Sequence, residues 1–472
     1  MTDPRRTMQN TKEWSMTRTT TWRRKATGLT AGIAVAALAL TACSSGGGGD
    51  EATTAAVSQA DIDKAMQTPT TLTFWTWVPD IQKEVDLFEK AYPQIKVEVV
   101  NVGQGADHYK KMRSALQSGK GAPDVTQIEF QHVQSFALGD NLLDLTPYIP
   151  ADTKDDYVPW VWKQVLSTDG SKIWSIPQDS GPMGILYRDD IFQAAGVQVP
   201  ATWDDFATAA QTIHTANPST YITNLPGNDM GQFTGMMWQI GARPFGWDGD
   251  KTVTIDVNSD KAQQLAQYWQ DLIQKDLVSV DPDFTDTWYQ GLANGKYASW
   301  SPAAAWGPVF LQGTAESTSG LWRAAQVPQW EAGGDPVSAN WGGSSDAVLK
   351  STKNPIAAAQ FALWLNHDPS STLMMANEQF LFPTTNDTLA SPEFADQKSE
   401  FYGGQEVNKL FAEISTTVPE DFGWLPFMDY AYSAGQETVG KAIADKGDVV
   451  GALKAWQDDL VGYAKQQGFT VK

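Results

Sequence analysis

The segment 71–128 alternates between strand and helix patterns, and this alternation restricts the fold more than any other feature of the chain. Runs rich in β-branched and aromatic residues predict strands, and the stretches between them carry apolar residues at helical spacing. The predicted strands are 71–77, 95–100 and 124–128. This order implies a parallel sheet with crossover helices. Ligands of such sheets bind beyond the carboxyl ends of the strands, which here are 75–80, 102–107 and 129–132.

A second block of strand and helix patterns runs from about Met183 to Trp300. Within it, the segment 262–276 places Leu265, Trp269 and Leu272 on one helical face, which predicts core packing. A short helix end, a glycine turn and a strand are predicted over 292–300. Because 472 residues exceed one compact core, we expect two α/β domains.

The N-terminal segment has the pattern of a secretory signal peptide. A basic cluster at 18–25 precedes the apolar stretch 29–40, which is shorter than the roughly 20 residues that span a bilayer. The stretch ends in Leu-Thr-Ala-Cys, and Cys43 is the only cysteine of the chain, so it resembles a bacterial lipobox. We predict a signal peptide over 1–42, lipid on Cys43 and a tether over 43–68. The alternative is an ordinary signal with an accidental cysteine.

The same segment predicts where the protein is located. The lipid would hold it on the outer face of the cytoplasmic membrane as a lipoprotein. Met16 is a plausible start, because it gives a signal of ordinary length, and the Arg23-Arg24 pair leaves both the general and the twin-arginine export route open.

Several classes of chemistry lack their sequence signals. A formal charge of −21 argues against nucleic-acid binding, which depends on Lys and Arg contacts to phosphates. The four His form no HExxH motif, and one cysteine excludes a multi-cysteine metal site. GxSxG and P-loop motifs are also absent from the sequence. We therefore expect no catalytic residue, no metal and no cofactor.

Tryptophan is abundant, with 20 residues in the chain. Trp269 and Trp364 lie on apolar helical faces and are predicted to be core residues. Others stand beside polar loop residues, and these are Trp77, Trp306, Trp341 and Trp424. Sugars present flat apolar faces edged by hydroxyls, so indole rings beside polar side chains suit a sugar site. For any single tryptophan, core packing remains the alternative.

Several segments resemble the extracellular solute-binding proteins of ABC transporters, in particular the sugar-binding, maltose-binding-protein-like type. The resemblance covers roughly Thr71 to Gly468. Its most specific part is Tyr-Arg-Asp at 187–189 followed by Gly-Val at 196–197 and Pro-Ala-Thr-Trp at 200–203. Further segments are LTFWTW at 72–77, GAPDV at 121–125, LLDLTPYI at 142–149, LANGKYASWSPAAAWG at 292–307, NWGGSSDAV at 340–348 and STKNPIAAAQFALWL at 351–365.

The resemblance implies an α/β fold of two discontinuous lobes, with a hinge and a ligand cleft between them. By position, lobe 1 would be 69–182 plus 325–353, and lobe 2 would be 183–324 plus 354–472. The lobes would close on the ligand by hinge motion, and the permease would recognise the closed form. We expect Arg188 to pack or pair near the hinge.

The resemblance also implies ligand-binding residues where the family's motifs match. In lobe 1 and the hinge these are Trp77, Asp80, Glu129, Gln131, Gln178, Asp179, Asn340, Trp341 and Gly342. In lobe 2 they are Asn228, Asp229, Trp306, Trp424 and Asp429. Where the family often has Gly-Pro-Trp, this chain has Ala304-Ala305-Trp306, so only the stacking indole carries over.

The predicted function is that of a lipid-anchored, non-enzymatic, monomeric receptor. It would capture a carbohydrate, a di- or oligosaccharide, and deliver it to the permease of an ABC importer. A polyol or a glycerol phosphodiester is an alternative ligand, although a phosphodiester calls for cations that the candidate loops lack. A secreted glycoside hydrolase is the rival class, since it would also use tryptophan subsites but needs two carboxylates across the scissile bond. A surface adhesin is a third class.

Overall fold

The computed structural model describes residues 56–472. The predicted signal peptide, the start at Met16, Cys43 and the Gly/Ser run lie outside the described residues. Within the segment predicted as a tether, helix α1 (Gln59–Met66) is capped by Ser58 and buries Met66. The tether prediction is therefore wrong for these residues, because an ordered helix packed on the domain is no flexible linker.

A five-stranded sheet has the order β2-β1-β3-β10-β4. Its strands are β1 (Thr70–Trp75), β2 (Ile95–Val100), β3 (Val125–Glu129), β4 (Ser175–Asp179) and β10 (Ser344–Val348). Strands β1, β2 and β3 are parallel, and β10 is antiparallel to both β3 and β4. The crossover helices are α2 (Gln82–Ala91) and α3 (Ala106–Ser118), so the predicted parallel unit is confirmed.

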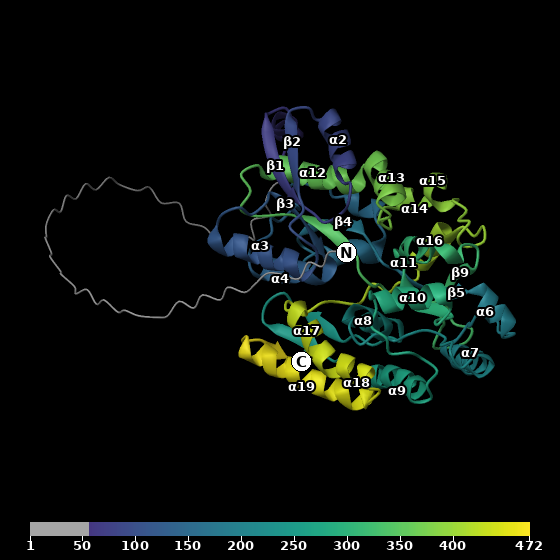
Figure 1. The fold of residues 1–472 in the computed structure, drawn as a ribbon. Coiled ribbons are helices and arrows are strands. Elements are labelled where there is room, and N and C mark those ends of the chain that lie inside the picture. Colours follow the sequence, from purple (N-terminus) through teal and green to yellow (C-terminus); the bar gives the residue numbers. More distant parts are fainter. Residues whose placement is uncertain (1–55) are drawn as a thin grey trace, which may run out of the picture. The chain divides into compact units, whose positions relative to one another are not determined.

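Helices α12 (Pro355–His367) and α13 (Pro369–Glu378) lie beside this sheet (Figure 1). Helix α12 contacts β10, β4 and α2, and its Phe361 ring lies 5.3 Å from Phe74 and 4.9 Å from Phe88. The predicted boundary gave residues from 354 onward to lobe 2. This placement is wrong for α12, because its buried apolar face covers the five-stranded sheet, and we group α12 and α13 with lobe 1.

A separate three-stranded sheet has the order β8-β5-β9. Its strands are β5 (Met183–Arg188), β8 (Ser299–Ala304) and β9 (Trp322–Gln326), and both outer strands run antiparallel to β5. Before β8, helix α10 (Asp286–Asn294) ends at Gly295 in the left-handed conformation. The helix end, glycine turn and strand predicted over 292–300 are therefore confirmed.

A second three-stranded sheet has the order β11-β7-β6. Its strands are β6 (Phe245–Trp247), β7 (Thr252–Ile255) and β11 (Thr470–Val471). Helix α19 (Val449–Gln466) contacts β7 and β11, and α9 (Asp260–Gln274) packs against α19. On α9, Leu265, Trp269 and Leu272 are buried, which confirms the predicted core face. Trp364 of α12 is partly buried and packs against the core as predicted.

The other helices connect or flank these sheets (Figure 1). They are α4 (Phe130–Leu138), α5 (Pro159–Gln164), α6 (Asp189–Ala194), α7 (Trp203–Ala216), α8 (Met230–Gln239), α11 (Gly307–Thr314), α14 (Asn386–Ala390), α15 (Pro392–Ala395), α16 (Val407–Ser415), α17 (Met428–Gly435) and α18 (Lys441–Ala444). Within residues 56–472, no helix is both long and apolar enough to cross a lipid bilayer.

Two connections join the five-stranded sheet to the β5 sheet, one between β4 and β5 and the other between β9 and β10. They pair with each other, because Trp341 N–H donates to Gly181 O at 2.8 Å and Met183 N–H donates to Ala339 O at 2.9 Å. A Cβ on Gly181 would lie 1.9 Å from the Trp341 carbonyl oxygen, so glycine is required for this approach. Arg188 binds Asp190 through Nε and Nη2, both at 2.8 Å, which confirms the predicted pairing. Its predicted place near the hinge is wrong, because Arg188 ends β5 opposite Trp322, at the end away from the two connections.

Candidate functional site

Two adjoining cavities, of about 270 Å³ and about 990 Å³, together form what we call the cleft. Both are lined by Glu129, Asp229, Trp341 and Gly342, so they are continuous. The smaller one adds residues of α8 and α17, and the larger one adds Trp77, residues of α11 and the segment 379–381. Segments from the five-stranded sheet and from the β5 side of the molecule therefore face the same space.

The carboxyl ends of the parallel strands border the cleft, as predicted from the strand order. Trp77 follows β1, Gln104 follows β2 and Glu129 ends β3, and all three line the larger cavity. The Trp77 ring packs edge-on against His108 with ring centroids 4.9 Å apart. Its backbone N–H donates to Gln127 Oε1 at 3.1 Å. These contacts hold the indole at the end of the sheet.

An aromatic wall lines the larger cavity, and we define it as Phe284, Trp306, Phe310 and Trp341. The Trp306 and Trp341 rings meet edge-on at 5.0 Å, and the Phe284 centroid lies 6.2 Å from Trp306 and 6.4 Å from Trp341. Trp306 precedes α11, and its Nε1 donates to the Trp341 carbonyl oxygen at 3.2 Å. The rings of the wall therefore support one another through direct contacts.

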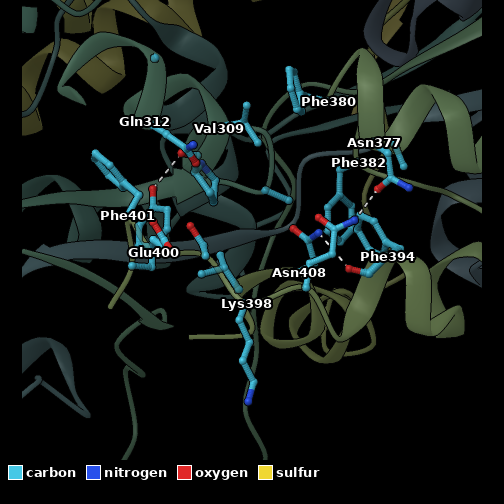
Figure 2. A pocket seen from close by; sticks show the side chains of 18 of the residues that line it. Val309, Gln312, Asn377, Phe380, Phe382, Phe394, Lys398, Glu400, Phe401 and Asn408 are labelled. Carbon is cyan, nitrogen blue, oxygen red and sulfur yellow. Dashed lines mark hydrogen bonds between the residues drawn. The ribbon is translucent and has the colours of Figure 1, made fainter. Parts of the chain in front are cut away.

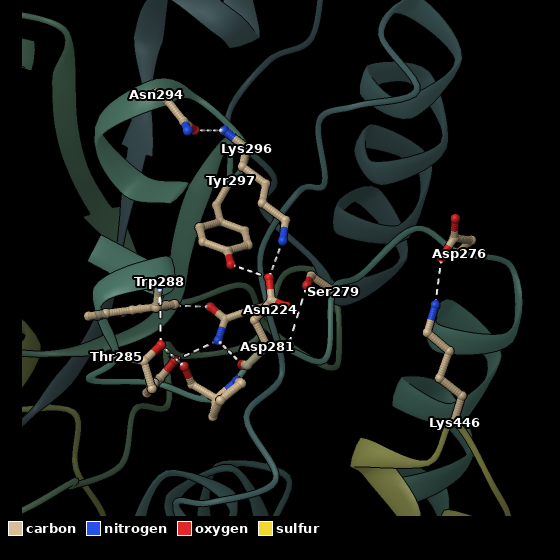
Figure 3. A network of polar contacts seen from close by, with 12 residues as sticks. Asn224, Asp276, Ser279, Asp281, Thr285, Trp288, Asn294, Lys296, Tyr297 and Lys446 are labelled. Carbon is tan, nitrogen blue, oxygen red and sulfur yellow. Dashed lines mark hydrogen bonds and ion pairs between the residues drawn. The ribbon is translucent and has the colours of Figure 1, made fainter. Parts of the chain in front are cut away.

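A polar network holds the loop that carries Phe284. Asp283 N–H donates to Asn228 Oδ1 at 3.0 Å, and Asn228 Nδ2 donates back to the Asp283 carbonyl at 3.2 Å. Asn224 Nδ2 donates to Asp283 Oδ1 at 2.5 Å, and Asn224 Oδ1 accepts from Trp288 Nε1 at 3.0 Å. Figure 3 shows this network beside Asp281, which accepts from Lys296 and Tyr297. The loop is thus fixed from both flanks.

Three carboxylates face the cleft, and burial raises the pKa of each. Burial raises the pKa of Glu129 to about 7, although Tyr109 O–H donates to its Oε2 at 3.0 Å. Burial also raises the pKa of Asp179, against the opposing effect of donation from Ser344 N–H at 2.8 Å. The pKa of Asp229 is raised for the same reason, while its Oδ1 caps α8 by accepting from Gly231 N–H at 2.8 Å.

No Lys or Arg is among the described residues that line the two cavities of the cleft. An anionic ligand would therefore meet carboxylates without a compensating cation, which is unfavourable in a partly buried site. A neutral ligand with many hydroxyl donors would instead pair with the carboxylate and amide oxygens. Among residues 56–472, no group of three or more His, Cys, Asp or Glu is arranged to hold a metal ion.

A charged cluster at the edge of the cleft joins elements of the two lobes, and we call Arg113, His132 and Asp429 the rim cluster. Asp429 of α17 forms an ion pair with Arg113 of α3, and its Oδ1 lies 3.3 Å from His132 Nδ1. His132 Nε2 in turn lies 3.7 Å from Glu129 Oε2. Burial lowers the pKa of His132 to about 4, so its ring is neutral at pH 7.

Most of the predicted site residues meet at the cleft, and three do not. The residues that line it are Trp77, Glu129, Gln131, Asp179, Asn228, Asp229, Trp306, Asn340, Trp341, Gly342 and Trp424. Gln178 lines neither cavity, because its Nε2 donates to the buried Asp346 at 2.8 Å and its Oε1 accepts from Ser344 Oγ at 3.3 Å. Asp80 is exposed in the turn before α2, and Asp429 belongs to the rim cluster. These three predicted residues do not line the cleft in this structure, because Gln178 joins a buried polar network, Asp80 lies in an exposed turn and Asp429 pairs with Arg113.

Trp424 lines the smaller cavity but is largely a core residue. Its side chain packs edge-on against Trp238 at 4.8 Å, and its Nε1 donates to Gln164 Oε1 at 2.7 Å. Core packing, the alternative considered for each tryptophan, therefore explains most of its surface.

Sequence reasoning missed several lining residues, above all Phe284, Phe380 and Tyr432. Phe284 and Phe380 have positive φ angles of 62° and 60° and exposures of 39% and 51%. Neither the positive φ angles nor the exposure of the rings can be inferred from the sequence around these two residues. A signal was available for Gln104, since it lies in one of the predicted strand-end segments.

Two lobes with a polar, aromatic-walled cleft between them define a ligand-binding receptor of the hinge-closing class. The family described as bacterial extracellular solute-binding protein matches residues 75–369, and the chain belongs to this family. An arabinooligosaccharide-binding protein of Halalkalibacterium halodurans is 24% identical over 383 residues, covering 78% of this chain and 82% of that protein. A lactose-binding protein of Rhizobium radiobacter is 25% identical over 373 residues, covering 74% of this chain and 82% of that protein.

A solved structure is similar over nearly its whole length. It is the ABC transporter associated binding protein of B. animalis subsp. lactis Bl-04 in complex with β-1,6-galactobiose. It is 32% identical, with a TM-score of 0.73, and the match covers 85% of this chain and 99% of that one. The expected two-lobe fold with a hinge and an interlobe cleft is thereby confirmed.

Proposed function

We propose that the protein captures a neutral di- or oligosaccharide in the cleft and delivers it to an ABC importer. The observation that carries the proposal is the aromatic wall beside three carboxylates, in a cleft that no Lys or Arg of residues 56–472 lines. Indole and phenyl rings suit the apolar faces of sugar rings, and carboxylates accept hydrogen bonds from hydroxyls. The sugars bound by the three similar proteins, an arabinooligosaccharide, lactose and β-1,6-galactobiose, support this proposal.

Different cleft residues would bind different parts of the sugar. Trp306 and Trp77 are partly exposed and offer stacking surfaces, and the buried Trp341 supports the Trp306 ring at 5.0 Å. Glu129, Asp179 and Asp229 accept from sugar hydroxyls, and Asn228 adds an amide. Closure of the lobes would exclude water, and the permease would read the closed form. A glycerol phosphodiester is disfavoured as a ligand, because its charge would face these carboxylates.

We further propose that the protein is a monomeric lipoprotein without catalytic activity. The lipobox-like sequence at 40–43 supports lipid on Cys43 and placement on the outer face of the membrane. The proposed lobe 1 is 69–182, 340–353 and α12 with α13, and lobe 2 is 183–339 with the remaining C-terminal residues. Residues 325–339 go to lobe 2 because β9 pairs with β5 and Trp330 packs against Trp203 at 5.7 Å.

Calorimetry on the full-length protein tests sugar binding. The panel holds the di- and tetrasaccharides of the malto, β-1,6-galacto, arabino, xylo and cello series, with glycerol and glycerol phosphate as non-sugar arms. We expect one-to-one binding of at least one sugar series and no reducing ends released during incubation. Turnover of any sugar would instead identify the protein as a glycoside hydrolase. Binding of glycerol phosphate alone would show that the ligand is a phosphate ester and not a sugar.

A further inference from the structure

The larger cavity of the cleft continues into a third cavity of about 860 Å³, which we call the side chamber. Both cavities are lined by Val309, Gly313, Phe380 and Leu381, so they adjoin between α11 and the segment 380–381, and we call this boundary the passage. The side chamber is bounded by α11, by 376–382 and by residues between 394 and 408 (Figure 2). Small-molecule sites occupy about 300–1,000 Å³, so each of the two joined spaces alone suffices for one ligand of that size.

Phe380 lies at the passage and has an energetically unfavourable backbone conformation. Its φ of 60° is unfavourable for a bulky residue, and at 51% it is the most exposed of the large apolar side chains described. Neighbouring hydrogen bonds hold it there, because Leu381 N–H donates to Met375 O at 3.2 Å and Ser180 N–H donates to Phe382 O at 3.1 Å. Strained residues that the surrounding structure holds in place concentrate at ligand sites.

Phe284 repeats this combination on the other side of the larger cavity. It too has positive φ and an exposed ring, and it belongs to the aromatic wall. Two exposed phenyl rings therefore line one cavity from different elements, one beside the wall and one at the passage. Stacking on a ligand would bury both rings, which explains why the fold tolerates their exposure and strain.

The side chamber itself has the mixture of surfaces that suits a neutral sugar. Its apolar lining includes the buried rings of Phe382, Phe394 and Phe401, together with Val309 and Leu381. Its polar part includes Gln312, which is exposed on α11, and the amides of Asn377 and Gln397, which are hydrogen-bonded to each other at 2.8 Å. In Figure 2 the Lys398 side chain extends away from the other lining side chains. Amides and phenyl rings without a convergent cation match the chemistry of the cleft.

We propose that the side chamber is a second set of sugar subsites and that Phe380 is the stacking platform between it and the cleft. The ligand is then a linear neutral oligosaccharide, longer than a disaccharide, with one end against the aromatic wall and the other in the side chamber. This inference rests on the proposed function, because it assigns the length of the sugar that the cleft binds.

The test compares chain lengths within each sugar series of the panel by calorimetry on the full-length protein. The tetrasaccharide of a bound series should bind at least about tenfold more tightly than its disaccharide. Phe380→Gly should bring this ratio to about one, whereas Phe380→Tyr, which keeps the ring, should preserve it. Gly313→Trp should also abolish the ratio, because a Cβ there meets nothing within 4 Å and an indole would fill the passage.

The variants also separate binding from folding. Glycine accepts positive φ without strain, so Phe380→Gly should melt at the wild-type temperature or above it. Equal affinity of di- and tetrasaccharides for the wild type would overturn the inference while leaving sugar binding intact. A length preference that survives both Phe380→Gly and Gly313→Trp would overturn it as well. Absence of binding by every sugar would overturn the proposed function, and the inference with it.

Discussion

Trp269 and Trp306 carry the same side chain in two different settings. Trp269 lies on the apolar face of α9 at 0% exposure, surrounded by Trp203, Phe206 and Tyr268. Trp306 precedes α11 at the cavity wall, half-buried, with its Nε1 directed to the Trp341 carbonyl. The first indole fills the core, and the second leaves a face toward the cleft. Residue type alone does not separate the two roles, but position within a helical stripe or in a loop does.

The largest effect should come from the core indole. Trp269→Ala should lower the free energy of unfolding by about 3–5 kcal/mol, because it leaves a large cavity among packed rings. Urea unfolding followed by circular dichroism measures the loss. Sugar affinity of the folded fraction should stay near the wild-type value. A variant of normal stability would show that this region of α9 is not part of the cooperative core.

The comparison between core and cleft also applies to carboxylates, and Glu129 is a largely buried carboxylate that faces the cleft. Its pKa is raised to about 7, so the folded state favours the protonated form. The contribution of Glu129 to the free energy of unfolding is complete below about pH 4.5 and is lost as the pH rises through about 7. Relative to Glu129→Gln, the wild type should therefore lose at most about 3 kcal/mol over this range. Urea unfolding of both proteins between pH 4 and 8 measures the difference, and parallel pH profiles would contradict it.

The cleft indole should affect binding more than folding. Trp306→Ala should weaken binding of the sugar found in the panel by at least about tenfold, or about 1.4 kcal/mol. Its stability should fall much less than that of Trp269→Ala, because Trp306 is only half-buried. Trp174→Ala is the matched control, since Trp174 lines neither cavity of the cleft. Unchanged affinity of Trp306→Ala would remove this indole from the sugar site.

The smallest effect should come from the rim cluster. Asp429 has a side-chain exposure of 51%, and ion pairs this exposed contribute about 1 kcal/mol or less. Asp429→Asn should therefore change sugar affinity by less than about fivefold, with a smaller change at high salt. Calorimetry at two salt concentrations measures this, with Arg113→Gln and the double variant completing a cycle. A hundredfold loss would show that Asp429 contacts the ligand directly.

Adjacent residues in β4 show why the site was only partly predictable. Asp179 faces the cleft, but Gln178 belongs to a buried network with Asp346 and Asn366. The β4–β10 pairing is irregular here, because Ser344 pairs with Asp179 and Ser345 with Pro177, so Gln178 has no partner of its own on β10. Such an irregularity redirects side chains locally, and a motif that covers both residues cannot show it. Asp80 does not line the cleft either. It lies in the turn after β1 with a φ of 58°, and its side chain is exposed.

The sequence by itself determined the local pattern of this protein: the parallel β1-β3 unit, the core face of α9 and the loop-borne Trp306 and Trp341. These follow from periodicity and residue type, which act over a few neighbouring positions. Only the tertiary structure decided that α12 covers the five-stranded sheet and that Phe284 and Phe380 are exposed at the cleft. Those features depend on contacts between distant segments, which fix backbone angles and side-chain directions that no short stretch of sequence specifies.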